Sequence, residues 1–299
     1  MATMNHTVSF DRACGKYVAM CDGKVVTKTK SLNRAKRLLR MHLEGLREVA
    51  KAEVDAGLNF SVADRFTFLE ALTTMVANGT SPSAIVTGEG GIGKTHTVTK
   101  TLASMGFVNC MEIPEGMSVP TRKTYTMVKG YSTPYALYRT LCENADRIVV
   151  FDDCDSILKD PTAINLLKAA LDSYSKRIVC WQSEVKGSDL PTSFVFNGGV
   201  IFISNYTLGT LDQAVRTRAL CVDLSMTADQ KLERMEQILR EPDYRTDVSL
   251  SMKLEALGAI RENLSKVKNL SLRTLKQVID VRKGNRKDWA KLALYVMSQ

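Results

Sequence analysis

The stretch from Gly88 to Thr95 constrains the fold of this chain more than any other. Its sequence is Gly-Glu-Gly-Gly-Ile-Gly-Lys-Thr, between the apolar run 84–87 and a segment of helical character. Glycines let successive backbone N–H groups turn inward around a polyphosphate, while the lysine reaches the outer phosphates and the hydroxyl holds Mg²⁺. A helix that begins at Lys94 also points the positive end of its dipole at the anion. The pattern predicts a strand, a phosphate-binding loop and a helix, and a chance glycine-rich turn is the alternative.

The residues of this loop, and the one after it, are the candidate nucleotide-binding residues. We expect the cofactor ATP to lie against Gly88, Glu89, Gly90, Gly91, Ile92, Gly93, Lys94, Thr95 and His96. Within this set Lys94 is also a candidate catalytic residue, because its ammonium offsets charge that grows on the phosphates.

A second apolar run ends in a pair of acids. Arg147-Ile-Val-Val-Phe leads directly into Asp152 and Asp153. The first acid at such a strand end binds the metal, and the next orients the attacking water. We therefore expect Thr95 and Asp152 to hold Mg²⁺ and Asp153 to position the water. Asp155 is a third acid nearby that competes for either role, and a strand that ends in solvated acids is the alternative.

These two motifs are followed by Gly199-Val-Ile-Phe-Ile-Ser-Asn205 and by Leu211-Asp-Gln-Ala-Val-Arg-Thr-Arg218. In this order the four elements resemble an AAA+ ATPase, over roughly residues 60–299. The resemblance implies that Asn205 is the sensor 1 residue that helps to place the water. It also implies that Arg218, with Arg216 second, is an arginine finger that reaches the γ-phosphate of a neighbouring subunit; a surface salt bridge is the alternative for both arginines.

A fifth element of the resemblance lies near the C-terminus. Ser271-Leu-Arg273-Thr-Leu is similar to the sensor 2 motif of the family, which implies that Arg273 contacts the nucleotide of its own subunit. The chain departs from the family at the acid pair, where Asp-Glu is usual and this chain has Asp152-Asp153. The second carboxylate is one methylene shorter, so slow, switch-like turnover is an open possibility.

The expected fold class is α/β, with three parts. Residues 1–56 form a small basic α+β module with a linker helix, residues 57–225 a parallel-sheet ATPase core, and residues 226–299 a helical lid. In the first part, strands are expected over 7–10, 17–20 and 24–27, with a hairpin turn at Asp22-Gly23 and a basic helix from Ser31 to about Val54. An amphipathic helix is expected over 62–77.

Charge is concentrated in the first part of the chain, whose net charge as a whole is +9. Seven bases without an acid lie between residues 24 and 40, and they are candidate contacts to nucleic acid: Lys24, Lys28, Lys30, Arg34, Lys36, Arg37 and Arg40. The arrangement resembles small DNA-binding arm domains in outline. A solvated surface, an oligomerisation module and a protein-docking module are the alternatives.

Composition excludes several classes of protein. No apolar run approaches the roughly 20 residues that cross a bilayer, and the N-terminus lacks the apolar core of a signal peptide. We expect a cytoplasmic protein, or one in the host cytoplasm if phage-encoded, without a membrane partner. The seven cysteines are scattered and odd in number, which favours reduced, mostly buried thiols over disulfides or a zinc site.

Two aromatic segments have open interpretations. Lys129-Gly-Tyr131 is either a channel loop that grips a polymer or a turn before a helix. The segment 177–196 is expected to form an extra hairpin, in which Trp181 either contacts DNA or packs in the core.

We expect an ATPase that hydrolyses MgATP as a homo-oligomer, either a ring or a helical filament, to remodel a DNA-associated complex of the replication, recombination or transposition type. The size and the small extra module suit a phage or mobile-element protein. A protein-remodelling ATPase indifferent to DNA, or an ATP-gated scaffold with little turnover, are the alternatives.

Overall fold

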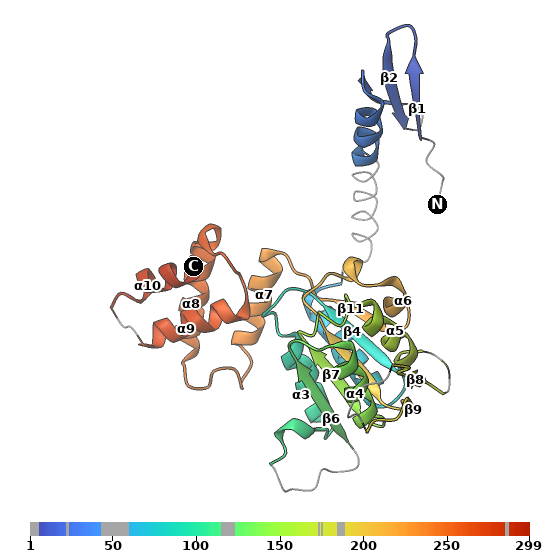
Figure 1. Cartoon of the computed structure of the whole chain (residues 1–299). Coiled ribbons are helices and arrows are strands. Elements are labelled where there is room, and N and C mark those ends of the chain that lie inside the picture. The colour runs from blue at the N-terminus through green and yellow to red at the C-terminus, as the bar shows by residue number, and fades with distance from the viewer. Residues whose placement is uncertain are drawn as a thin grey trace. The chain divides into compact units, whose positions relative to one another are not determined.

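The computed structural model describes residues 6–21, 24–42, 60–114, 123–172, 174, 176–183, 189–284 and 287–299 (Figure 1). The chain divides into two units, Met1–Phe60 and Ser61–Gln299. Each unit has a hydrophobic core of its own, small in the first and extensive in the second.

The first unit is a three-stranded antiparallel sheet with a helix on one face. Its strands, in the order in which they pair, are β1 (His6–Asp11), β2 (Lys16–Cys21) and β3 (Lys24–Thr29). The described helix covers residues 32–42, and its Ala35 and Leu39 are buried against Ala19 and Cys21 of β2. The three expected strands are confirmed, while the turn at Asp22-Gly23 and the helix beyond residue 42 lie outside the described residues.

A six-stranded parallel sheet, of order β11-β4-β10-β7-β6-β5, is the centre of the second unit. Its strands are β4 (Ser83–Thr87), β5 (Val108–Asn109), β6 (Thr124–Lys129), β7 (Ile148–Asp152), β10 (Gly199–Ile203) and β11 (Leu220–Asp223). Every residue of β4, β7 and β10 is buried, which explains why these segments are continuous apolar runs. The expected α/β fold with a parallel sheet is confirmed.

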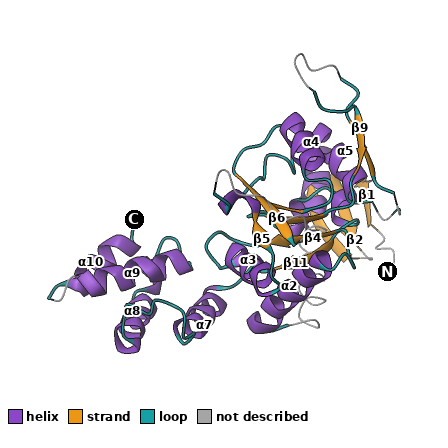
Figure 2. Ribbon diagram, turned by 90° about the horizontal axis from the view of Figure 1, so that it is seen from below, coloured by secondary structure: helices purple, strands orange, loops and turns teal. Residues whose placement is uncertain are grey.

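Helices cover both faces of this sheet (Figure 2). One face packs on α2 (Val62–Ala77) and α3 (Lys94–Ser104), and the other on α4 (Pro134–Glu143) and α5 (Pro161–Ala170). Successive residues of β7 alternate between the two cores, with Phe151 on the α4 and α5 side and Val150 on the α2 and α3 side. The result is a three-layer α/β/α arrangement.

The bounds of α2 follow from local side-chain chemistry. Ser61 and Asp64 form a capping box, in which each side chain accepts a hydrogen bond from the other residue's backbone N–H. The helix ends before Asn78 and Gly79, and Gly79 adopts a φ of 72° that favours glycine. The helix expected over 62–77 is confirmed.

Four helices make up the C-terminal part of the second unit. They are α7 (Ala228–Leu239), α8 (Leu250–Glu262), α9 (Leu272–Gly284) and α10 (Trp289–Met297), and they share one hydrophobic core. The helical character expected here is confirmed, and the division of the unit after residue 225 stays a prediction. In the described parts of the chain, no helix combines the length and the apolar character that crossing a bilayer requires.

The remaining elements are short. An antiparallel hairpin of β8 (Ile178–Cys180) and β9 (Ser193–Val195) precedes β10, as expected for the segment 177–196. The others are η1 (Cys110–Glu112), η2 (Leu208–Thr210), α6 (Gln213–Arg216) and η3 (Leu264–Lys266). All seven cysteines lie in the described ranges and are free thiols. The expectation that most of them are buried is wrong, because only Cys21 and Cys154 are buried.

Candidate functional site

The loop between β4 and α3 has a backbone that requires glycine. Gly88, Gly91 and Gly93 have φ angles of 134°, 74° and 104°. A Cβ on Gly88 would also lie 3.0 Å from the backbone carbonyl carbon of Leu224. Such left-handed positions turn backbone N–H groups toward one side of the loop, at the start of a helix, where an anion is favoured.

Lys94 lies beneath this loop with only 5% of its surface exposed. Its Nζ donates to the carbonyl oxygens of Gly88 and Glu89, at 2.7 and 2.8 Å, and to Oδ1 of Asn205 at 3.0 Å. Burial lowers the pKa of Lys94, and nearby carboxylates, Asp153 foremost, oppose that shift. The ammonium is therefore held by oxygen acceptors next to the position where the helix dipole favours phosphate.

The acid pair lies at the carboxyl end of β7. Thr95 Oγ1 donates to Oδ1 of Asp152 at 2.9 Å, and Asn205 Nδ2 donates to Oδ1 of Asp153 at 2.7 Å. Asp153 has a φ of 56°, a left-handed backbone that is uncommon for non-glycine residues and that aspartate tolerates better than most. Lys129, at the end of β6, lies 3.6 Å from Asp152. Side chains from four separate segments of the chain thus meet at one edge of the sheet.

Asp155, the third acid, has a different environment. Its Oδ1 accepts a hydrogen bond from the hydroxyl of Ser204 at 2.6 Å, and the same hydroxyl accepts from the N–H of Tyr206 at 3.1 Å. Ser204 is fully buried. Asp155 therefore fixes the turn that carries Asn205, while Asp153 is the acid that contacts Asn205 itself.

The start of α9 closes over the loop. The N–H of Leu272 donates to the carbonyl oxygen of Gly91 at 2.8 Å. A Cβ on Gly91 would lie 3.1 Å from Cβ of Ser271, and a Cβ on Gly90 would lie 3.9 Å from Nη1 of Arg273. The structure therefore places Arg273 beside the phosphate-binding loop, where the family resemblance implied it.

A cavity of about 350 Å³ lies between the loop and the C-terminal helices. Charged groups of both signs line it, and Ile238, Tyr244 and Leu272 supply apolar surface. The other lining residues are Gly91, Gly93, Lys94, Thr95, His96, Asp152, Asp153, Ile203, Arg234, Glu241, Arg273 and Lys276. Charged and apolar groups in one cavity suit a ligand that joins a polyphosphate to a ring.

Sequence reasoning missed two contacts between the loop side and α7. The guanidinium of Arg234 lies 3.9 Å from the ring centroid of Phe66 in α2, and its Nε is buried without a partner among the described residues. Glu89 of the loop pairs with Lys231 of α7. Neither pair has a local sequence signal, because the partners come together only when α7 packs beside α2 and the loop.

The donor set fits Mg²⁺. The hydroxyl of Thr95 and the carboxylate of Asp152 are adjacent oxygen donors, and Mg²⁺ is typically held by one or two carboxylates together with substrate phosphates and water. Among the described residues, no three His, Cys, Asp or Glu side chains gather into a metal-binding group. The arrangement therefore suits a metal that arrives with a phosphate ligand better than one held by protein alone.

The two finger candidates lie far from the loop of their own chain. The carbonyl oxygen of Arg218 accepts from Ser83 Oγ at the amino end of β4, whereas the loop follows the carboxyl end of that strand. Arg218 is half-buried, with Nη1 donating to the Ala214 carbonyl at 3.0 Å, while Arg216 is exposed and contacts only the Leu208 carbonyl, at 3.3 Å, in the described hydrogen bonds. Arg216 is therefore the more accessible of the two guanidinium groups.

The two aromatic candidates, Tyr131 and Trp181, lie in different environments. Tyr131 is 81% exposed between Gly130, with a φ of 85°, and the start of α4, so the segment is a turn before a helix. Trp181 packs edge-on against Tyr135, with ring centroids 5.4 Å apart, and lies 5.9 Å from the ring of Tyr138. Trp181 is thus part of the packing between α4 and the hairpin.

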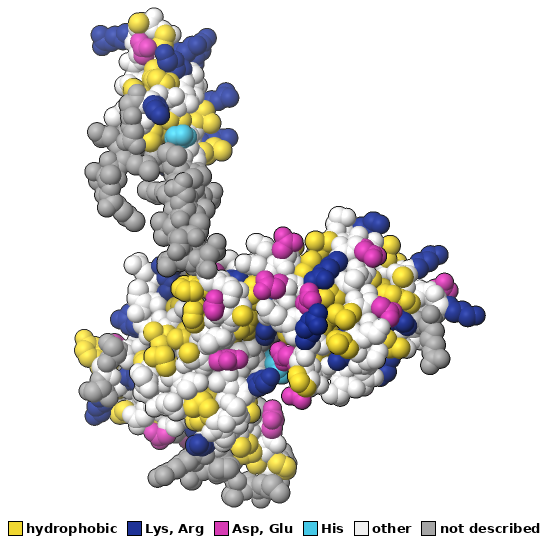
Figure 3. Space-filling view, turned by 180° about the vertical axis from the view of Figure 1, so that it is seen from behind, with side chains coloured by type: hydrophobic (Ala, Val, Ile, Leu, Met, Phe, Trp, Pro, Cys, Tyr) yellow, Lys and Arg dark blue, Asp and Glu magenta, His cyan; other side chains and the backbone are white. Residues whose placement is uncertain are grey.

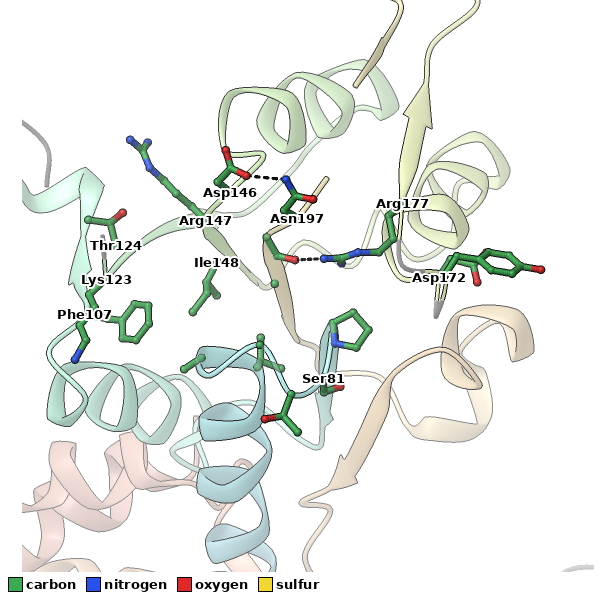
Figure 4. A pocket seen from close by; sticks show the side chains of 18 residues that line it. Ser81, Phe107, Lys123, Thr124, Asp146, Arg147, Ile148, Asp172, Arg177 and Asn197 are labelled. Atoms are coloured by element: carbon green, nitrogen blue, oxygen red, sulfur yellow. Dashed lines mark hydrogen bonds between the residues drawn. The ribbon is translucent and has the colours of Figure 1, made fainter. Parts of the chain in front are cut away.

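A second cavity, of about 680 Å³, lies at the amino ends of β4, β6, β7 and β10 (Figure 4). Arg177 donates to the carbonyl oxygens of Ala170 and Gly198, at 2.9 and 2.7 Å, and Asn197 donates to Asp146 at 2.9 Å. Ligands of open α/β sheets bind outside the carboxyl ends of the strands, so this cavity is not the candidate site.

Three comparisons with known proteins complete the description. No protein-family model matches the chain. The chain is 26% identical over 295 residues to the uncharacterized 36.7 kDa protein of the nrdC-mobD intergenic region of Enterobacteria phage T4, across 92% of this chain and 87% of the phage protein. In the structure of C. elegans PCH-2, 79% of this chain overlaps 67% of that chain with a TM-score of 0.40 and 14% identity, a loose likeness that carries no functional argument.

Proposed function

We propose that this protein is an ATPase that binds MgATP between its phosphate-binding loop and α9. One observation carries the proposal: Lys94 contacts Asn205, Asn205 contacts Asp153, and Thr95 contacts Asp152, all at the loop that needs three left-handed glycines. A polyphosphate on the loop would meet a cation, a metal-binding pair and a carboxylate–amide pair at once. Phosphoryl-transfer sites need those groups together.

In the bound state, the loop N–H groups and the start of α3 hold the polyphosphate, and Lys94 exchanges its loop carbonyl acceptors for phosphate oxygens. Arg273 supplies a second cation from the C-terminal helices. The apolar side chains of Ile238 and Tyr244, which line the cavity, take the purine ring. The nucleotide thereby joins the sheet to the C-terminal helices.

Hydrolysis follows from the carboxylate–amide pair. Asp153 accepts a hydrogen bond from the attacking water, and Asn205 holds the Asp153 carboxylate in place. The water oxygen bonds to the γ-phosphorus while one of its protons passes to Asp153 and the bond from that phosphorus to the bridging oxygen breaks, which gives ADP and inorganic phosphate; Asp153 then releases the proton to solvent. Lys94 stabilises the charge that develops on the phosphate oxygens.

Thr95 and Asp152 would hold Mg²⁺, which when bound neutralises phosphate charge and orients the β- and γ-oxygens. The chain's own contribution is the orientation of these two ligands. Lys129 lies 3.6 Å from the other carboxylate oxygen of Asp152, so it also restrains this ligand.

The active form is proposed to be a homo-oligomer, a ring or a filament. The finger candidates lie at the amino edge of the sheet, and β4 alone separates that edge from the loop by about 13 Å at 3.3 Å per residue. An arginine there meets a phosphate site only if the site belongs to a neighbouring copy. Its exposure makes Arg216 the better candidate and Arg218 the second, the reverse of the order that the sequence favoured.

The ATPase is further proposed to act on a DNA-associated complex, as a phage or mobile-element protein. The support is charge: within residues 1–42 there are nine Lys or Arg against Asp11 and Asp22, which gives this segment a net charge of +7 when the net charge of the whole chain is +9. The similar phage T4 protein agrees with such an origin, although its name states no activity.

Steady-state hydrolysis of ATP by the full chain tests the proposal. Asp153→Asn should lower kcat by about 10²-fold or more, because a misoriented water loses general-base assistance. Asp146→Asn is the matched control, since Asp146 contacts Asn197 at the amino ends of the strands, away from the phosphate-binding loop. Lys94→Ala and removal of Mg²⁺ with EDTA should also abolish turnover.

ATP turnover measured with duplex DNA at low and at moderate salt tests the DNA-associated role separately from ATP hydrolysis. Stimulation that fades with salt supports the DNA-associated role. Turnover that DNA leaves unchanged contradicts that role and favours a protein partner, while the ATPase assignment stands. Equal activity of wild type and Asp153→Asn would refute the hydrolytic mechanism and leave an ATP-gated scaffold.

A further inference from the structure

The face of the N-terminal sheet that points away from the helix has an unusual composition. Cross-strand pairing puts residues that oppose one another on the same face. On this face, Thr7 of β1 pairs with Met20 of β2, which pairs with Val25 of β3, and Ser9 of β1 pairs with Val18 of β2. The helix side holds the alternate residues, among them the buried Ala19 and Cys21.

Folding alone does not account for the apolar residues of this open face. A sheet covered on one side is expected to present polar residues on the other. Here Val25 is 52% exposed and Met20 is half-exposed, although the described helix packs on the opposite side. Val25 and Met20 therefore form a small apolar centre in contact with solvent, whereas Val18, which pairs with Ser9 and Lys28 on the same face, is only 7% exposed.

Cations and hydroxyls surround that apolar centre. Lys28 pairs with Val18, Lys16 pairs with Asp11, and both lysines are exposed. Arg12 is exposed in the turn next to Asp11. The Asp11 carboxylate accepts from the N–H of Ala13 and from the Cys14 thiol, so this acid is committed to its turn.

We propose that this open face binds duplex DNA in the major groove. Lys16, Lys28 and Arg12 would contact phosphates on either side, while the hydroxyls of Thr7 and Ser9 and the methyl groups of Val25 would meet base edges. This inference rests on the proposed DNA-associated role and names the surface and the form of nucleic acid.

The net charge of the unit and the position of its aromatic rings favour duplex DNA as the ligand of the open face. Nine Lys or Arg against two Asp in residues 1–42 repel most basic partners and attract polyanions, and few blue side chains of this unit have a magenta neighbour in Figure 3. A single strand would need aromatic rings on which bases stack. The two rings of the sheet, Phe10 and Tyr17, pair edge-on with centroids 5.0 Å apart on the helix side of the sheet. The open face thus suits a duplex.

The helix offers a competing surface. Arg34, Lys36, Arg37 and Arg40 are exposed on its outer side. Long basic side chains on a helix whose opposite side is buried are satisfied by water, so they need no partner. The apolar centre of the sheet face has no such explanation, which is why the sheet is the proposed contact.

Fluorescence anisotropy of a random-sequence duplex, titrated with full-length protein at several salt concentrations, tests the assignment. Lys16→Gln/Lys28→Gln should weaken binding at least about tenfold and reduce the slope of log affinity against log salt by about 2. Arg34→Gln/Arg37→Gln removes the same charge and should leave both quantities nearly unchanged. Circular dichroism and DNA-free ATP turnover check that each variant is folded.

Each other result overturns a defined part of the argument. If the helix variant loses affinity and the sheet variant does not, the face is wrong while the DNA-associated role stands. A wild type that prefers the single strand to the duplex refutes the proposed form of nucleic acid. A wild type without salt-dependent binding to either refutes this inference together with the DNA-associated role, and leaves the ATPase proposal to its own assay.

Discussion

The contact between Gly91 and Ser271 is expected to hold the C-terminal helices on the phosphate-binding loop. Gly91→Ala puts a side chain on a residue with a φ of 74°, and its Cβ lies 3.1 Å from Cβ of Ser271 and 3.3 Å from its Oγ. Gly79→Ala is a matched control, because Gly79 has a φ of 72° and nothing within 4 Å of its Cβ. Both variants strain the backbone equally, but only the first also displaces a neighbour.

The magnitudes separate the two variants. A left-handed alanine costs about 1–2 kcal/mol, and crowding a packed contact adds about 1–3 kcal/mol. At about 2–4 °C per kcal/mol, Gly79→Ala should lower the melting temperature by about 2–8 °C and Gly91→Ala by roughly twice that. Because Ser271 precedes α9, Gly91→Ala should also weaken nucleotide binding by at least about tenfold, or 1.4 kcal/mol.

Differential scanning fluorimetry and titration with a fluorescent ATP analogue measure both effects. Ser271→Gly in the Gly91→Ala background removes both close atoms of the serine, so it should recover the crowding part of the loss, with a coupling energy of about 1–3 kcal/mol in a double-mutant cycle. The reasoning fails if Gly91→Ala and Gly79→Ala lose the same stability, or if the cycle shows no coupling.

Three further outcomes are expected. Arg216→Ala should lower turnover more than Arg218→Ala does. Mixing Arg216→Ala protein with an inactive loop variant should restore part of the rate, because an intact arginine of one copy can then meet an intact phosphate-binding loop of another. Unchanged turnover of both arginine variants would exclude an arginine finger at these positions. Burial raises the pKa of Cys154 to about 11, so about one thiol in a thousand is ionised at pH 8, and iodoacetamide with mass spectrometry should label the exposed Cys14 far faster; rapid labelling of Cys154 in the folded protein would contradict its burial. Trp181→Phe removes a buried Nε1 that lacks a partner among the described residues, so it should change the melting temperature by no more than about 4 °C. DNA binding by this variant should stay intact. Loss of DNA binding would indicate that Trp181 contacts the nucleic acid.

Local motifs allowed much of the site to be predicted. The loop needs left-handed glycines and a following lysine in one contiguous stretch, so its identity is visible in the residues themselves. The apolar run that ends at Asp152 is equally local, because a strand buried on both faces must be apolar along its length.

The choice between Asp153 and Asp155 was not predictable in this way. It depends on β10 pairing with β7, which sets Ile203 opposite Asp152. The next two residues of the chain then meet different acids: Ser204 contacts Asp155, and the residue after it contacts Asp153. Only the register between two strands that are distant in sequence separates these roles.

Tertiary contacts also decide which of the two arginines is the better finger candidate, and they decide the environment of Arg234. Arg216 and Arg218 are both basic residues before β11, and only the carbonyl groups around them distinguish an exposed guanidinium from a half-buried one. Arg234 meets Phe66 because α7 packs near α2, a tertiary contact that no periodicity encodes.

The left-handed backbone at Asp153 bears on how such a site can change its acid. Short polar side chains tolerate this conformation best, since they can bond to nearby backbone, and a longer acid gains nothing from it. The short acid and the left-handed backbone at this position therefore suit one another. A glutamate here would carry its carboxylate one methylene farther along the same bend, so it would meet the amide of Asn205 only if the end of β7 shifted.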